Sequence, residues 1–179
     1  MSPQPLDLPF DPIERAGELW GERFGPAEAM RAATSIMRAQ QLLIGRFDAV
    51  LKPHALTFAR YEALVLLHFS RSGALPLSMI GRRLMVHPTS VTNSIDRLVS
   101  QGLVERKPNP RDGRGVLAAI TSAGRELVAT ATDDLMRDGF GLGAYDRVQL
   151  DELFRLLRVI RLDAGDFPDV ASDTTTRTS

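Results

Sequence analysis

Residues 78–100 read SMIGRRLMVHPTSVTNSIDRLVS, and their pattern is the strongest indication of the fold. It predicts a short helix that begins at Ser78, ends near Met85 and is followed by a tight turn. Pro88 suits the first position of the next helix, because proline has no N–H to donate and its φ angle is already helical. Gly102 ends that second helix. Two short helices joined by so tight a turn are typical of a helix-turn-helix.

The second of these helices has two chemically different faces. At about 100° per residue, its apolar face holds Val91, Ile95, Leu98 and Val99. The opposite face holds Thr89, Ser90, Asn93, Arg97 and Ser100. Asparagine can pair with an adenine edge, arginine with guanine or phosphate, and hydroxyl groups with phosphates. This face predicts contact with a DNA major groove, whereas a merely solvated helix usually carries more lysine and glutamate.

A basic hairpin follows the two helices. Residues 103–107 and 116–120 alternate in polarity, and the Pro, Asn, Asp and Gly between them favour a turn. The basic residues of the hairpin are Arg106, Lys107, Arg111 and Arg114. Asp112 is expected to orient Arg114, because a carboxylate fixes a neighbouring guanidinium. Such a ribbon can place an arginine in a minor groove, so the whole segment predicts a winged helix; an ordinary solvated loop is the alternative.

Charge is distributed unevenly along the chain. The 179 residues have no net charge, with 22 basic and 22 acidic side chains. Residues 71–114 hold eight basic and three acidic side chains, whereas residues 1–28 and 133–179 are acidic. A basic middle between acidic ends indicates a nucleic-acid surface. Asp96 lies at the rim of that surface and would repel phosphate, so we expect it to pair with Arg82 or Arg114.

The composition excludes several functional classes. The absence of cysteine excludes disulfides, thiolate nucleophiles and Cys-based metal sites. No secretory signal or membrane-spanning run is present, which predicts a cytoplasmic protein with no membrane partner. Motifs of metalloproteases, phosphate-binding loops and serine hydrolases are missing, so we expect no enzyme and no cofactor. His54, His68 and His87 are too scattered to predict a metal site, and His87 is expected to cap the recognition helix.

Helical patterns lie on both sides of this central region. Asp11 is expected to cap a first helix that Gly25 ends, and a longer helix is expected from Pro26 to Leu51. Its side chains predicted to face a core are Met30, Ala33, Met37, Ile44, Phe47 and Leu51. Thr57 is expected to cap a buried central helix that ends at Phe69. Two more helices are predicted from Thr121 to Asp138 and from Asp146 onward.

The central region resembles the MarR family of transcriptional regulators. The resemblance is carried by HPTSVTNSIDRLVSQGLVERK at residues 87–107 and NPRDGRGVLAAITSAGREL at residues 109–127, and it extends over residues 28–163. By motif match, the family's DNA contacts fall on Thr89, Ser90, Thr92, Asn93, Arg97 and Arg114. Asn109 and Gly113 replace an aspartate and an arginine of the usual wing pattern, which puts one contact of the wing in doubt.

The resemblance also implies an assembly and a domain organisation. It implies a homodimer in which the first long helix and the last helix interleave. Two recognition helices would then enter successive major grooves of a palindromic operator, about 34 Å apart. We expect a mainly α fold with a small β-wing, divided into four segments. These are an N-terminal arm with dimerisation helices (1–56), the winged helix-turn-helix lobe (57–121), C-terminal dimerisation helices (122–166) and a disordered tail (167–179).

Members of this family often bind small anionic compounds between the dimerisation helices and the DNA-binding lobe. The extra N-terminal helix with Trp20 is similar to the subgroup that responds to urate and related acids. In that match an acid falls on Glu62 and an arginine on Arg106. A second arginine falls on Ser94, which makes a citrate-like or other carboxylate as plausible as urate. Without the resemblance, Glu62 could act as a switch through a shifted pKa, or it could form a structural ion pair with a nearby arginine. Trp20 could pack in the core, or its ring could support a bound ligand.

The leading hypothesis is therefore a sequence-specific, homodimeric DNA-binding repressor that a small anionic effector releases. Two alternatives keep the winged helix: a protein-interaction module without DNA affinity, and a DNA-binding protein that ignores effectors. A third is an enzyme that uses the crevice. Apolar or acidic residues on the wing and recognition face would indicate the protein-interaction module, and this sequence lacks them.

Overall fold

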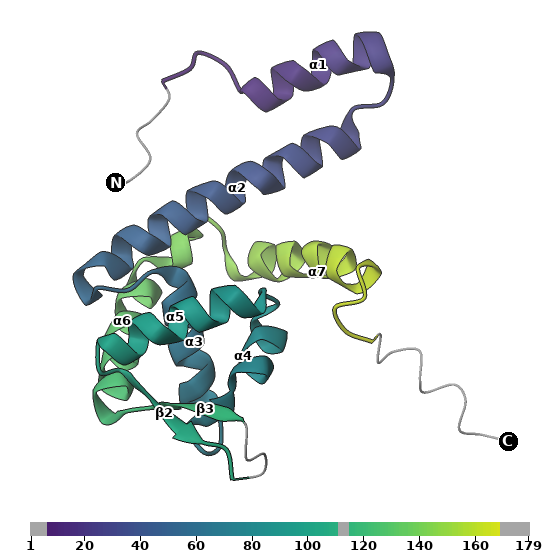
Figure 1. The fold of residues 1–179 in the computed structure, drawn as a ribbon. Helices are drawn as coiled ribbons and strands as arrows, with labels where there is room; N and C mark the ends of the chain where they lie inside the picture. The colour runs from purple at the N-terminus through teal and green to yellow at the C-terminus, as the bar shows by residue number, and fades with distance from the viewer. Residues whose placement is uncertain (1–6, 111–114, 169–179) are drawn as a thin grey trace, which may run out of the picture. The chain divides into compact units, whose positions relative to one another are not determined.

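The computed structural model describes residues 7–110 and 115–168, which form a mostly helical fold with a small antiparallel sheet (Figure 1). The predicted class, mainly α with a small β-wing, is confirmed. The helices are α1 (Pro12–Phe24), α2 (Glu28–Leu51), η1 (Lys52–His54), α3 (Phe58–Phe69), α4 (Leu77–Leu84), α5 (Pro88–Ser100), α6 (Ser122–Arg137), η2 (Gly139–Gly141) and α7 (Arg147–Asp163). The strands are β1 (Ala74–Pro76), β2 (Val104–Pro108) and β3 (Val116–Ile120). The chain forms two compact units, residues 1–141 and 142–179.

Side-chain caps set several of the helix starts that the sequence predicts. Asp11 accepts a hydrogen bond from the N–H of Ile13 at 2.8 Å at the start of α1. The hydroxyl of Thr121 accepts one from Gly124 at 3.0 Å at the start of α6. Asp146 begins α7 in a reciprocal capping box. These caps satisfy N–H groups that have no partner within the helix, which fixes where each helix begins.

The cap of α3 differs from the prediction. Thr57 occupies the N-cap position, but its side chain makes no capping hydrogen bond. Asp48 of α2 instead accepts the N–H of Phe58 at 2.7 Å. A residue ten positions upstream can serve because η1 turns the chain back, so this cap depends on tertiary structure.

A strand that the sequence analysis did not predict extends the wing. β1 pairs antiparallel with β3, and the sheet order is β1-β3-β2. Ala118 of β3 pairs with Leu75 on one side and with Arg106 on the other. Three residues are too few to show a period of two, so the pattern gave no signal for β1. Its pairing joins the start of α4 to the base of the wing.

The core of the first unit is centred on α3. Leu64 and Leu67 of α3 are fully buried, as the all-round apolar pattern predicts. Ile95 of α5 and Leu135 of α6 are also fully buried in the same cluster. Burying each such side chain contributes about 1.5–3 kcal/mol. The central helix thus holds the recognition helix and α6 on one apolar core.

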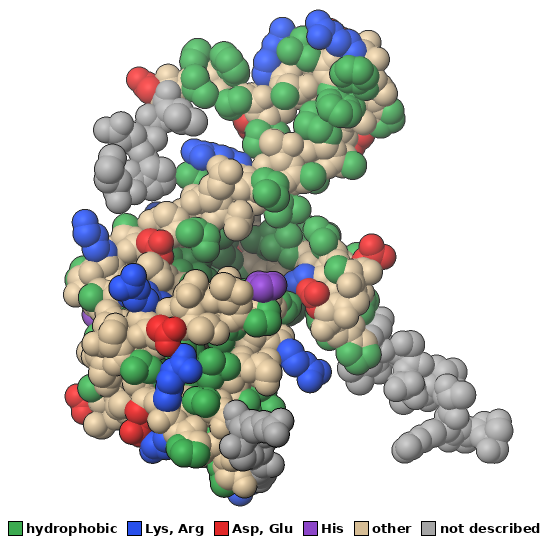
Figure 2. All heavy atoms as spheres, in the orientation of Figure 1, with side chains coloured by type: hydrophobic (Ala, Val, Ile, Leu, Met, Phe, Trp, Pro, Cys, Tyr) green, Lys and Arg blue, Asp and Glu red, His purple; other side chains and the backbone are tan. Residues whose placement is uncertain are grey.

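The first half of α2 does not face a core within one chain, contrary to expectation. Of the side chains predicted to do so, only Phe47 and Leu51 are buried, whereas Met37 is 59% exposed. Trp20 and Phe24 of α1 are also exposed, at 40% and 73%. Figure 2 shows hydrophobic side chains spread over the surface of these two helices. This unit therefore leaves an apolar face uncovered.

In the second unit, the described residues 142–168 bury no side chain. No residue of α7 is buried. Its large exposed apolar side chains are Val148, Leu150, Phe154, Leu156, Val159 and Ile160. An amphipathic helix gains most of its stability by packing that face. This helix therefore needs a partner surface.

Two glycines provide a test of the packing between α6 and the wing. A Cβ at Gly124 would collide with the carbonyl oxygen of Leu103 and approach Ile120 to 2.8 Å, whereas one at Gly21 meets nothing within 4 Å. We expect Gly124→Ala to destabilise the fold by about 1–3 kcal/mol, because a backbone atom cannot yield cheaply. The matched control Gly21→Ala should be neutral or stabilise by up to about 1 kcal/mol. Urea unfolding measures both, and equal effects would contradict the packing.

Candidate nucleic-acid interface

The turn between α4 and α5 is built as the sequence predicts. Met85 adopts a left-handed conformation with φ 56°, which ends α4. The N–H of Val86 then bonds to the carbonyl of Gly81 at 3.1 Å. His87 precedes α5, and its Nδ1 accepts the N–H of Thr89 at 3.3 Å, so the predicted histidine cap is confirmed. These contacts orient the start of the recognition helix.

The two faces of α5 separate as expected. Val91, Ile95 and Leu98 are at most 3% exposed. The exposed residues of this helix include Thr89, Ser90, Thr92, Asn93, Arg97 and Ser100. The Thr92 hydroxyl donates to the carbonyl of Pro88 at 3.2 Å, one turn earlier. Packing of the apolar stripe therefore presents the polar groups outward, where they can meet a nucleic acid.

An ion pair joins the recognition helix to the wing. Asp96 of α5 accepts a bond from Nη2 of Arg106 on β2 at 2.6 Å. The expectation of an arginine partner is confirmed, but the candidate Arg82 was wrong, and the other candidate, Arg114, lies outside the described residues. Arg106 is the partner because the register of the hairpin places it beside α5. The pair offsets a negative charge that would repel phosphate.

The hairpin that carries the predicted wing contacts closes just beyond the strands. The N–H of Asn109 bonds to the carbonyl of Gly115 at 2.9 Å. At the base, Lys107 pairs with Glu105 at 2.6 Å. The predicted tip residues Arg111, Asp112 and Arg114 lie outside the described residues. The hairpin prediction itself is confirmed by the pairing of β2 with β3.

A basic residue on α4 that the sequence analysis did not assign to DNA lies beside the recognition helix. Arg82 and Thr92 line one hollow of about 500 Å³ between α4 and α5. Arg82 is exposed. The first helix of a helix-turn-helix crosses the DNA backbone, so this position suits a phosphate contact.

The three residues predicted to bind an effector have different surroundings in the described part of the chain. Glu62 lines a hollow of about 40 Å³ with Ser90 and Ser94. Burial raises the pKa of the half-buried Glu62 carboxyl above its ordinary value. Trp20 lies on α1 against Phe24, with ring centroids 5.0 Å apart. Arg106 is engaged by Asp96, as described above.

Glu62 also lacks the ion-pair partner that one reading of the sequence predicted. Among residues 7–110 and 115–168, no hydrogen bond or ion pair reaches its carboxylate. Ser94, which lines the same hollow as Glu62, carries no charge that could pair with the carboxylate. Within the same described part of the chain, no group of three or more His, Asp or Glu side chains could hold a metal ion. No helix found there is long and apolar enough to cross a membrane.

The burial of Glu62 predicts a distinct pH dependence of stability. A raised pKa means that the folded state keeps its proton to higher pH than the unfolded state does. The free energy of unfolding therefore falls as pH rises above the ordinary glutamate pKa of about 4.3. Glu62→Gln cannot ionise, so we expect it to be more stable than the parent at pH 7, with a difference that shrinks as pH approaches 4. Urea unfolding across this range measures the effect.

The matched control for this change is Glu126→Gln, at an exposed position on α6. It should leave the pH profile of stability close to that of the parent. A Glu62→Gln variant that is less stable than the parent at pH 7 would show that the carboxylate has a partner.

A helix-turn-helix followed by a β-hairpin, with an exposed polar face on its second helix, defines a winged-helix DNA-binding protein. Residues 56–115 match the MarR family. The structure of Sco5413, a MarR family transcriptional regulator from Streptomyces coelicolor, has 63% sequence identity to this chain and a TM-score of 0.73. That match covers 79% of this chain and 98% of Sco5413. The chain belongs to the MarR family of transcriptional regulators and is a DNA-binding regulator, not an enzyme.

Two further similarities agree with this assignment. The uncharacterised HTH-type transcriptional regulator YhbI of Bacillus subtilis is 32% identical over 106 residues. That match spans 59% of this chain and 66% of YhbI. Sco3205 of Streptomyces coelicolor, a MarR family regulator solved in complex with DNA, has a TM-score of 0.68 over 77% of this chain and 88% of its own. Its 23% identity makes it a likeness of fold.

Proposed function

We propose that this regulator is a homodimeric, cytoplasmic repressor that binds a palindromic operator in double-stranded DNA and is released by a small anionic effector. The observation that carries the DNA-binding part is the outward polar face of α5, fixed by a fully buried apolar stripe. The proposed DNA contacts are Thr89, Ser90, Thr92, Asn93, Arg97, Arg111 and Arg114. The cytoplasm is where such an operator is found.

These side chains would make different kinds of contact with DNA, according to their chemistry. Asn93 can bond two positions of an adenine edge, which supplies base preference. Arg97 can reach guanine or phosphate, and the hydroxyls of Thr89 and Ser90 can bind phosphates and fix the register. The wing arginines extend the contact to the neighbouring minor groove, with Asp112 orienting Arg114. Arg82 adds a phosphate contact from α4.

The uncovered apolar surface supports the homodimer. α1, the first half of α2 and α7 all expose large apolar side chains that a monomer would leave in water. Exposed apolar patches of this extent mark interaction surfaces. A second copy of the chain, related by a two-fold axis, would cover these faces with the same faces of its own. Segments 1–56 and 122–166 would then be the dimerisation segments, and 57–121 the DNA-binding lobe.

The charge of the cavities bears on where an anionic effector would bind. The Glu62 hollow is small, and the Glu62 carboxyl, when ionised, opposes a carboxylate or urate there. A larger hollow of about 660 Å³ lies against α2 and includes Arg46 and Asp138. Nε and Nη2 of Arg46 bond to Asp138 at 2.8 and 2.7 Å, and the guanidinium lowers the pKa of that carboxyl. A carboxylate effector could compete with Asp138 for Arg46 in this hollow. We therefore favour this hollow as the effector site over the predicted set Trp20, Glu62 and Arg106.

The DNA contacts can be tested on the intergenic DNA upstream of the gene for this chain. Affinity should fall steeply as salt rises, because counterions are released on binding phosphates. Arg114→Ala should weaken binding to every sequence and lower the slope of log affinity against log salt by about 1. Asn93→Ala should also lose about 1–3 kcal/mol of discrimination between bases. Fluorescence anisotropy over a salt series measures these effects.

A matched control for these variants is Thr130→Ala on α6, whose hydroxyl bonds only within its own helix. It should bind as the parent does. Salt-independent affinity, or parental binding by both Arg114→Ala and Asn93→Ala, would contradict the proposed contacts.

The homodimer can be tested by placing a charge on α7. Ile160 is 55% exposed in the single chain. Ile160→Glu should shift the chain toward monomer, because a carboxylate buried in an apolar interface costs far more than the same group in water. Sedimentation velocity measures the state, with Arg147→Glu at the exposed start of α7 as control. Dimers that persist equally in both variants would exclude α7 from the interface.

A further inference from the structure

A short corner between the first long helix and the central helix makes contacts that the regulator's DNA binding has not yet used. Residues 52–56, here called the η1 corner, comprise η1, Ala55 and Leu56. Ala55 is left-handed, with φ 55°, and its N–H bonds to the carbonyl of Lys52 at 3.0 Å. Leu51, just before the corner, and Leu56, its last residue, are 0% and 3% exposed. Two buried anchors and a closed turn leave the corner little freedom to move.

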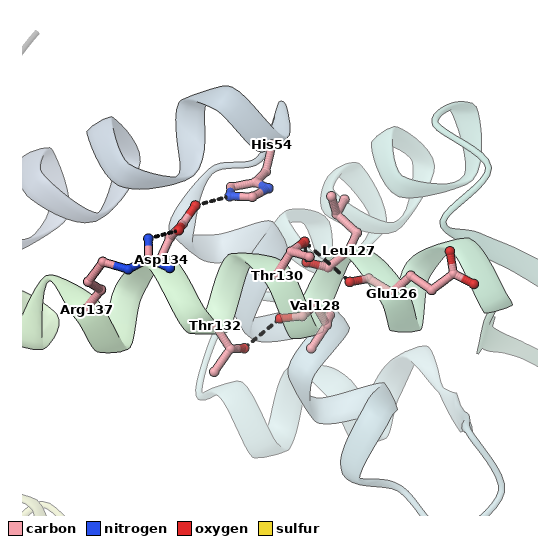
Figure 3. Close-up of polar contacts among 8 residues, drawn as sticks. All are labelled: His54, Glu126, Leu127, Val128, Thr130, Thr132, Asp134 and Arg137. Atoms are coloured by element: carbon pink, nitrogen blue, oxygen red, sulfur yellow. Dashed lines mark hydrogen bonds and ion pairs between the residues drawn. The ribbon is translucent and has the colours of Figure 1, made fainter.

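One side of the corner is tied to α6. Nε2 of His54 lies 2.7 Å from Oδ2 of Asp134, and the His54 side chain is only 15% exposed. Figure 3 shows the ring facing Asp134 across the space between the corner and α6. Asp134 is also bound by Arg137, and His54 and Arg137 together lower the pKa of its carboxyl. The carboxylate is therefore ionised at neutral pH and available to the imidazole.

The other side of the corner is tied to the recognition helix. Nε2 of Gln101 donates a hydrogen bond to the carbonyl of Ala55 at 3.0 Å. Gln101 is the C-cap residue of α5, and its own N–H bonds back to Arg97. The side chain thus fastens the last turn of α5 to a residue 46 positions earlier in the chain. The η1 corner is linked through polar contacts to α6 and to the end of α5.

The His54–Asp134 and Gln101–Ala55 contacts, here called the two ties, restrict the orientation of α5 more than they affect its burial. The apolar core holds Ile95 and Leu98, but apolar packing is non-directional and permits small rotations. Hydrogen bonds restrict angle as well as distance. A helix of 13 residues is about 20 Å long, so a small movement at Gln101 is carried to Thr89 at the other end.

We propose that the η1 corner sets the orientation of the recognition helix, α5, relative to α2 and α6, with His54 and Gln101 as positioning residues for operator spacing. This inference rests on the proposed homodimer, in which the separation of the two recognition helices selects the spacing of the half-sites. His54 and Gln101 touch no base in this arrangement. They determine how strictly the dimer rejects a half-site at the wrong place.

Operator spacing can separate a positioning role of His54 and Gln101 from a merely stabilising one. The ratio of affinities for operators of different spacing changes only if these residues position the helix. Inserting or deleting one base pair between half-sites displaces the second by about 3.4 Å and rotates it by about 35°. We expect the parent to bind both altered operators about tenfold more weakly than the natural one. A general loss of stability lowers affinity for all three operators alike and leaves this ratio unchanged.

The variants remove each tie without adding charge. Gln101→Met keeps the length of the side chain and removes the donor, and His54→Leu removes the bond to Asp134. Both should reduce the tenfold spacing penalty to about threefold or less. Gln101 is exposed, so Gln101→Met is expected to fold even if His54→Leu does not. Thermal unfolding confirms that binding is measured on folded protein.

A matched control changes a hydroxyl on α6 that takes no part in either contact. The Thr130 hydroxyl bonds to carbonyl groups of α6 itself (Figure 3). Thr130→Ala should keep the parental penalty. Gln101→Met with an undiminished penalty would overturn the inference while the homodimer stands. A parent that binds all three operators equally would overturn the homodimer proposal, and the inference with it.

Discussion

The burial of the apolar stripe of α5 against the central helix is the constraint on which the rest of the structure depends. Val91, Ile95 and Leu98 must be removed from water, and α3 supplies the surface because it is apolar on every side. Because α5 is helical, covering that stripe turns the small polar side chains of the opposite face toward solvent. The DNA-reading surface is thus a consequence of packing.

Electrostatic pairing then decides which charges on that surface remain available. Asp96 would weaken phosphate binding, but Arg106 offsets its charge and fixes the base of the wing in the same contact. Glu62 of α3 has no such partner among the described residues, and burial raises its pKa. Asp96 is paired because it lies beside an arginine of the hairpin, whereas Glu62 lies beside the uncharged Ser94.

Other parts of the molecule have surfaces that one chain cannot satisfy. The first half of α2 was expected to face a core and does not, and α7 buries no residue. The error in predicting α2 has a physical cause, because a hydrophobic period shows that a face is to be buried but not which chain will bury it. A two-fold assembly requires a surface on each chain that can pair with the same surface of a second copy. The uncovered apolar faces of α2 and α7 meet this requirement.

Local interactions were determined by the sequence alone. The caps at Asp11, His87 and Thr121, the faces of α5 and the hairpin of β2 and β3 all follow from residues a few positions apart, so their patterns were readable. The three-residue strand β1 and the Asp48 cap of α3 were not. Nor were the pairs Asp96–Arg106, His54–Asp134 and Arg46–Asp138, whose members lie 10, 80 and 92 positions apart. Only the tertiary structure decided these, because a charged side chain is compatible with many partners until packing of the core brings one within reach.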